Sequence, residues 1–141
     1  MNASTAELGT FLKLMNHSDV APSGLKDRVL SRVLNEPCRV ETDVWGGVVS
    51  VNPAFTALCG YSFDEIVGRK PGSFLQGAES DPVTVEILRS AVAQAESCDV
   101  EMINYHKNGS PYRVRIVTEP LRDISGTLTG FRAVEFQLPL D

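Results

Sequence analysis

Apolar and polar residues alternate through the last third of the chain with the period of two that is typical of β-strands. Between residues 110 and 121, Tyr112, Val114 and Ile116 share one face, and arginines occupy the positions between them. The dipeptide Asn108-Gly109, which is typical of tight hairpin turns, precedes this segment, and the turn RDISG follows it. The pattern predicts three antiparallel strands joined as a meander.

The last of these strands carries apolar residues on both faces. Phe131, Ala133 and Glu135 share one face, whereas Val134 and Phe136 lie on the other. Each face therefore needs a cover, and an N-terminal helix is a candidate for one of them.

Two further strands are predicted at residues 38–43 and 48–52, around a glycine turn. The helical region begins directly after them. Asn52 is a good N-cap, Pro53 suits the first helical position because its missing N–H has no partner there, and Gly60 ends the helix.

Short helical segments continue to the start of the meander. Ser62 and Glu65 have the spacing of a capping box, and Gly68 ends the turn that they start. Asp81 opens the longest helix, which we place at residues 82–97.

Residues 1–36 show helical periodicity and predict two short helices, the second with an apolar stripe between residues 23 and 36. That stripe needs a partner surface, either in a homodimer or on its own subunit. We divide the chain into an N-terminal helical extension (1–36) and an α+β domain (37–141). The domain should contain a five-stranded antiparallel sheet with short helices on one face.

Composition narrows the classes of function. The 141 residues fit one domain with some extra length, and the net charge of −5 argues against nucleic-acid binding. No apolar run approaches the roughly 18 residues of a membrane span, and no secretory signal is recognisable, which favours a cytoplasmic location. The three cysteines lack CxxC spacing, which indicates reduced thiols rather than a disulfide framework or a zinc site.

The stretch GRKPGSFLQG, residues 68–77, interrupts the helical region with two glycines and a proline. One interpretation is that the break bends the backbone around a hollow, with Phe74 and Leu75 on its wall and the Gln76 amide pointing inward. The alternative is an ordinary loop, with Phe74 and Leu75 as plain core residues.

The order of elements, together with VNPAFTALCGYSFDEIVGRKPGSFLQG and EMINYHKNGSPYRVRIVTEPLRDISGTLTGF, resembles the PAS family of sensory domains over about residues 38–138. The resemblance is closest to the light-oxygen-voltage (LOV) branch. That branch carries an NCRFLQG motif, an INY strand followed by KxG, and a P-x-R-D turn. The resemblance implies a sheet with short helices around a ligand cavity, and a flavin (FMN or FAD) as its cofactor.

The motif departs from the LOV pattern where the photochemistry occurs. Alignment on FLQG puts Gly72 at the cysteine that bonds to flavin in photoactive LOV domains, Pro71 at the asparagine and Ser73 at a phosphate-binding arginine. One residue is also inserted between Gly68 and Phe74. Because glycine has no side chain to attack with, we expect no adduct at this position.

Other flavin positions of the family are retained in part. The resemblance implies that Gln76 and Asn104 hydrogen-bond the flavin and that Arg89 binds its phosphate. A second asparagine of the family is here Val114, and its loss leaves polar atoms of the ligand unmatched at about 1–3 kcal/mol.

Glu135 stands where the family has a glutamine that responds to protonation of the flavin. A carboxylate there would oppose negative charge on a reduced flavin, whereas a protonated Glu135 could donate a hydrogen bond. We therefore predict that Glu135 tunes a redox equilibrium. The simpler interpretation is a glutamate at a strand edge that reaches solvent or pairs with an arginine.

Haem is disfavoured as a cofactor, because His17 lies in the extension and His106 lies near the Asn108-Gly109 turn, where a solvated histidine is expected. No cluster of residues has the spacing of a metal site. An enzymatic function is also disfavoured, because the chain has no catalytic triad order and no phosphate-cradling glycine loop followed by Lys-Ser/Thr.

Two functions remain. The first is a cytoplasmic sensory module, photoreceptor-like or redox-sensitive, that signals through a homodimer or a partner protein. The second is a cofactor-free PAS interaction domain with a filled pocket. Pro71, Ser73 and Val114 stand where the LOV branch has polar ligand-binding side chains, and this replacement favours the second function.

Overall fold

The structure is a computed structural model that describes residues 36–140. The helices predicted before residue 36, with their proposed role in dimerisation, lie outside the described residues. In chain order the elements are β1 (Cys38–Thr42), β2 (Val48–Val51), α3 (Pro53–Cys59), α4 (Phe63–Ile66), α5 (Gly72–Leu75), α6 (Pro82–Ala93), β3 (Cys98–Tyr105), β4 (Pro111–Arg122) and β5 (Leu128–Leu138).

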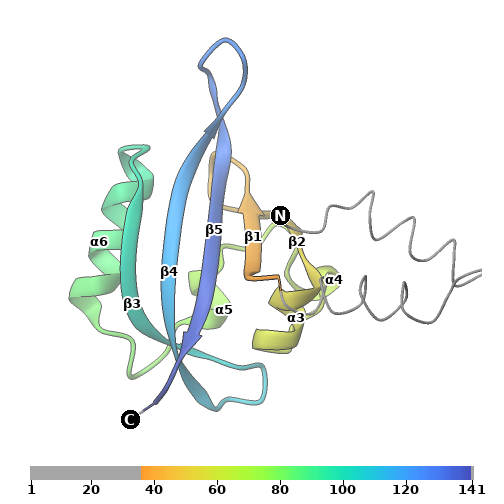
Figure 1. Cartoon of the computed structure of the whole chain (residues 1–141), viewed down its shortest axis with the longest axis vertical. Helices are drawn as coiled ribbons and strands as arrows, with labels where there is room; N and C mark the ends of the chain where they lie inside the picture. Colours follow the sequence, from red (N-terminus) through yellow and green to blue (C-terminus); the bar gives the residue numbers. More distant parts are fainter. Residues whose placement is uncertain (1–35, 141) are drawn as a thin grey trace, which may run out of the picture. The chain divides into compact units, whose positions relative to one another are not determined.

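The strands form one antiparallel sheet in the order β2-β1-β5-β4-β3 (Figure 1). The last strand of the chain therefore lies in the middle, between the first strand and the meander. Glu135 is paired with Cys38 of β1 on one side and with Ile116 of β4 on the other. The predicted five-stranded antiparallel sheet with short helices is confirmed.

Helix α3 begins and ends where its capping residues predict. The Asn52 side chain accepts hydrogen bonds from the backbone N–H of Phe55 (3.1 Å) and of Arg39 (2.9 Å), so one amide fixes both the helix and the strand before it. Gly60 ends the helix with a φ of 87°, in the left-handed region that favours glycine.

Helix α6 is shorter than predicted, because it ends at Ala93 rather than near residue 97. The N–H groups of Ala95 and Glu96 donate to the carbonyl groups of Val92 and Ala91, which is the Schellman arrangement. Ala95 takes the left-handed position, with a φ of 54°. The sequence does not predict this helix end, because residue 95 is alanine, the best helix former, at a position that is usually glycine.

The helices pack against the two ends of the strand order. Helix α6 contacts β3, whereas α3 contacts β1 and α4 contacts β2 (Figure 1). One hydrophobic cluster joins β1 and β2 to α3, α4 and α5, with Val48, Phe55 and Ile66 at 1% exposure or less. A second cluster includes Met102 of β3 and Tyr112 of β4, with Val85 and Leu88 of α6 packed against it.

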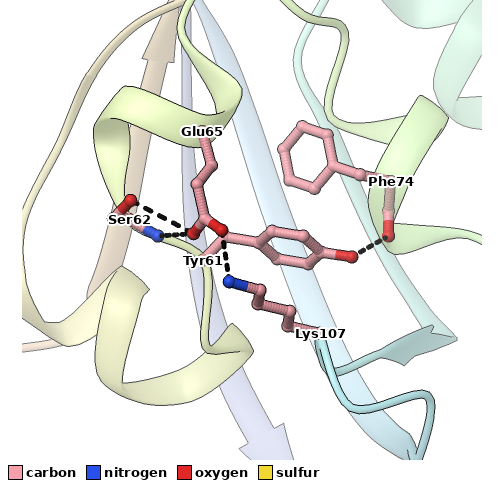
Figure 2. Close-up of polar contacts among 5 residues, drawn as sticks. All are labelled: Tyr61, Ser62, Glu65, Phe74 and Lys107. Carbon is pink, nitrogen blue, oxygen red and sulfur yellow. Dashed lines mark hydrogen bonds and ion pairs between the residues drawn. The ribbon is translucent and has the colours of Figure 1, made fainter.

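Three polar contacts and one aromatic contact hold the segment between α3 and α5 in place (Figure 2). The Tyr61 hydroxyl donates to the Phe74 carbonyl oxygen (3.4 Å), and the two rings meet edge to face at 5.0 Å. The Glu65 carboxylate caps α4 by accepting from the Ser62 N–H, and it pairs with Lys107 of the β3–β4 turn. The hydrogen bond from the Lys107 ammonium group is the main reason why the pKa of Glu65 is lowered to about 2.

Arg113 and Arg115 of β4 lie on the outer face of the sheet, as their alternation predicts. Arg115 pairs with Asp99 (2.7 Å) and Arg113 pairs with Glu101 (3.1 Å) across the β3–β4 ladder. Such exposed pairs contribute little stability, because water and salt screen the charges. Among residues 36–140, no helix has the length and apolar character needed to cross a membrane.

Candidate functional site

A cavity of about 660 Å³ lies against the inner face of the sheet. This volume is within the roughly 300–1,000 Å³ of sites that bind small molecules. Its wall is formed by inward residues of β1, β3, β4 and β5, by α5 and α6, and by the β1–β2 turn. The apolar members of the wall are Val40, Trp45, Pro71, Leu75, Val85, Leu88, Val92, Met102, Ile116, Phe131 and Ala133.

The break at residues 68–72 gives the cavity one side of its wall. Gly68 has a φ of 80°, which turns the chain, and α5 then begins at Gly72. Gly72 and Gln76 both line the cavity. A Cβ atom on Gly72 would lie 3.0 Å from the Gln76 amide nitrogen, so the absence of a side chain at Gly72 leaves room for that amide.

Asn104, Glu135 and Cys38 form a buried polar group beside the cavity. Asn104 is 2% exposed and Glu135 is 4% exposed, and both line the cavity. The Asn104 amide donates to one carboxyl oxygen of Glu135 at 3.4 Å, and the Cys38 thiol approaches the other at 3.8 Å. Both contacts are long, so the carboxyl group retains hydrogen-bonding capacity toward the cavity.

Burial raises the pKa of Glu135 to about 7, and the contact with the Cys38 thiol opposes this shift weakly. None of the ion pairs among the described residues includes Glu135. The interpretation of Glu135 as a strand-edge residue that reaches solvent or pairs with an arginine is therefore wrong, because β5 is a central strand and its inner face is covered. The same burial raises the pKa of the Cys38 thiol well above its usual range.

Three cationic side chains also line the cavity: Lys70, Arg89 and Arg132. Arg132 is paired with Glu41 (3.2 Å), and Arg89 is paired with Glu86 of its own helix (3.3 Å). None of the ion pairs within residues 36–140 includes Lys70. Lys70 is thus available to an anionic group in the cavity, whereas Arg89 would have to exchange its partner Glu86 for such a group.

Two of the residues predicted to contact the cofactor do not line the cavity. Phe74 is buried against Tyr61, with the Arg69 guanidinium 5.1 Å from its ring centre, and it does not line the cavity. The neighbouring Leu75 does line the cavity, as predicted. Val114 is fully buried in the second hydrophobic cluster and does not reach the cavity wall either. The structure thus brings together Gly72, Gln76, Arg89, Asn104 and Glu135 of the predicted set.

His106 is packed rather than solvated, which corrects the expectation for that turn. Its ring lies 4.3 Å from the Tyr112 ring, and its Nδ1 is 2.7 Å from the Leu58 carbonyl oxygen. Within residues 36–140, no group of three or more His, Cys, Asp or Glu side chains is arranged to hold a metal ion. His17 lies outside the described residues.

The wall also contains residues that the sequence-based prediction did not name, among them Trp45, Lys70 and Thr118. Trp45 is 78% exposed in the β1–β2 turn, where an exposed tryptophan is unusual enough to serve as a signal. Lys70 lies within the interrupted stretch itself. Thr118 follows Tyr112, Val114 and Ile116 in the inward alternation of β4 and could have been found by extending it.

The family assignment agrees with this geometry. The PAS domain family matches residues 40–136, and the chain belongs to that family. Blue-light-activated histidine kinases of Brucella canis and Brucella abortus are each 36% identical to it over 94 residues, or 67% of this chain. The chain spans 19% of the length of these relatives.

Solved LOV domains have the same fold. The light-state structure of the blue-light photoreceptor Aureochrome1 LOV has a TM-score of 0.71 and 29% identity, covering 79% of this chain and 88% of that one. The LOV domain from an Erythrobacter litoralis blue-light activated histidine kinase has a TM-score of 0.68 and 28% identity, covering 72% and 95%.

Replacement of Glu135 by glutamine should change how stability depends on pH. Folded Glu135 keeps its proton up to about pH 7, whereas the unfolded chain releases it near pH 4.5. Its contribution to the free energy of unfolding is therefore greatest below pH 4.5 and falls by about 3 kcal/mol as the pH rises to 7. Urea unfolding between pH 4 and 8 should show this fall in the wild type and not in Glu135→Gln. Substitution of the exposed Glu96 by glutamine (Glu96→Gln) is the control. Parallel pH profiles for wild type and Glu135→Gln would contradict the raised pKa of Glu135.

Proposed function

We propose that this PAS domain is the sensory module of a signalling protein and that its cavity binds a flavin, FMN or FAD. The observation that supports this best is the convergence of Gln76, Asn104 and Glu135 on one apolar cavity of about 660 Å³. A few directed polar groups in an apolar wall suit a flat ring with one hydrogen-bonding edge. The LOV relatives favour the same ligand class.

Each group of the wall has a role in this proposal. Asn104 and Gln76 hydrogen-bond the polar edge of the ring, and the apolar residues of β4, β5 and α6 exclude water from it. Lys70 and Arg89 attract the phosphate, since two cations face the same cavity. A bound flavin supplies absorption of blue light and reversible reduction.

Light sensing by a thiol bond is not part of the proposal. Gly72 has no side chain, and none of the three cysteines lines the cavity. Cys59 is 1% exposed in the hydrophobic cluster, where burial raises its pKa to about 11, so it is a poor nucleophile. The chain itself is a sensor without catalysis, and redox change or flavin photoreduction is the signal we infer.

The output passes to a second copy or to a partner protein in the cytoplasm. The outer face of the sheet is a candidate contact surface. Phe136 is 42% exposed there, with the Arg115 guanidinium 5.9 Å from its ring centre. Aromatic and arginine side chains are enriched in protein interfaces.

Protein purified after expression with excess riboflavin should be yellow, with flavin absorption bands, and should release FMN or FAD on denaturation. Asn104→Ala should weaken flavin binding about tenfold to a hundredfold, because it leaves ligand atoms unpaired. Ser50→Ala, on the exposed side of β2, is the control. A colourless protein that does not bind added flavin would overturn this proposal and support the cofactor-free interaction domain.

Gly72→Cys should introduce the missing photochemistry into flavin-loaded protein. The new side chain crowds the Gln76 amide, which is the flexible end of its side chain and can move by a few tenths of an ångström. Under blue light the variant should bleach and recover in the dark, whereas the wild type should show photoreduction at most. A reversible thiol bond in the wild type would contradict our assignment of Cys38, Cys59 and Cys98 as unreactive toward the flavin.

Glu135→Gln should shift the flavin midpoint potential in a pH-dependent way. Above pH 7 the Glu135 carboxylate opposes negative charge on reduced flavin, so the variant should have the higher potential at pH 8, by tens of millivolts. At pH 6, where Glu135 is protonated, the two potentials should lie closer together. Spectroelectrochemical titration measures both, with Glu96→Gln as the control. Equal potentials for wild type and Glu135→Gln at pH 8 would refute redox tuning by Glu135.

A further inference from the structure

Thr118 carries a hydroxyl group without a partner on the cavity wall. The residue is 6% exposed, and its Oγ1 has no hydrogen-bond partner among the described residues. It belongs to the inward row of β4 and lines the cavity. A buried unpaired hydroxyl costs about 1–3 kcal/mol, so its presence on this wall needs an explanation.

The residues next to Thr118 on the neighbouring strands do not supply a hydrogen-bond partner for its hydroxyl group. Ala133 lies directly opposite on β5, and Cys98 lies opposite on β3. Ala133 has no side-chain donor or acceptor, and the Cys98 thiol makes no hydrogen bond to the Thr118 hydroxyl. A valine at residue 118 would have nearly the same shape without the cost of an unpaired hydroxyl. The group that could pair with Thr118 therefore comes from the contents of the cavity.

The strand register orders the polar groups of the wall. Asn104 lies opposite Tyr112, and Glu135 lies opposite Ile116, which is two residues before Thr118 on β4. Along β4 the rows therefore follow in the order Asn104, Glu135 and Thr118, and the 3.4 Å contact between Asn104 and Glu135 shows that the side chains of the first two rows meet. Thr118 thus lies toward the opposite end of the cavity from Asn104.

We propose that Thr118 determines ligand specificity, by selecting a flavin whose benzenoid edge carries a hydrogen-bonding substituent such as a hydroxyl group. This inference rests on the proposed function. If Asn104 and Gln76 hold the pyrimidine edge and Glu135 lies beside the middle of the ring system, the benzenoid edge extends toward Thr118. Ordinary flavins carry two methyl groups on that edge, and a methyl group leaves the Thr118 hydroxyl unpaired.

The test compares riboflavin with the analogue in which one benzenoid methyl group is replaced by hydroxyl, using equilibrium dialysis. The wild type should bind the analogue roughly 5- to 150-fold more tightly than riboflavin, which corresponds to one satisfied buried hydroxyl. Thr118→Ser retains the hydroxyl and should retain the preference. Thr118→Val should lose it.

Thermal unfolding of the ligand-free variants supplies a second measurement. Thr118→Val should melt no lower than the wild type, because it removes an unpaired polar atom, so its loss of preference cannot be ascribed to misfolding. Equal preference for the analogue in wild type and Thr118→Val would overturn the inference while leaving the flavin proposal intact, and it would indicate that water satisfies the hydroxyl. Failure of every variant to bind either flavin would refute the proposed function and the inference together.

Discussion

The central position of β5 is the constraint on which the cavity depends. This strand is the last in the chain, yet it is paired with β1 on one side and β4 on the other. Its inward residues therefore face the cavity from the middle of the sheet, where helices and neighbouring strands exclude water. Glu135 is buried because of this topology, and its raised pKa follows from the burial.

The same topology explains why a carboxyl group is tolerated without a cation. An ionised glutamate in this place would be costly, so the neutral form is favoured at pH values where exposed glutamates are charged. The cations of the cavity, by contrast, lie on residues that are exposed or half-buried, such as Lys70 and Arg89. The wall thus combines a buried, neutral hydrogen-bonding group with cations at exposed positions, and this combination supports the proposal of a ligand with a flat ring and an anionic tail.

Prediction from the sequence succeeded where a single residue type has one dominant local role. Asn52 and Gly60 mark the two ends of α3. The alternation in β4 and β5 assigns the inner and outer faces of these strands correctly. It failed at two places in the helical region. Ala95 ends α6 in a left-handed position that glycine usually occupies, and Phe74, which was expected on the cavity wall together with Leu75, packs against Tyr61. Burial of Glu135 depends on the strand order, which alternation alone does not determine.

Two groups with different roles can be distinguished among the buried polar residues of the α+β domain. Asn52 and Ser80 are saturated with short hydrogen bonds to the backbone: Asn52 also donates to the Pro37 carbonyl at 2.8 Å, and Ser80 donates to the Ile103 carbonyl at 2.6 Å. Those side chains hold the fold. Glu135, with two long contacts, and Thr118, with no partner among the described residues, face the cavity instead. Because burial penalises unsatisfied polar atoms, we infer from this unused hydrogen-bonding capacity that this part of the wall contacts the proposed ligand.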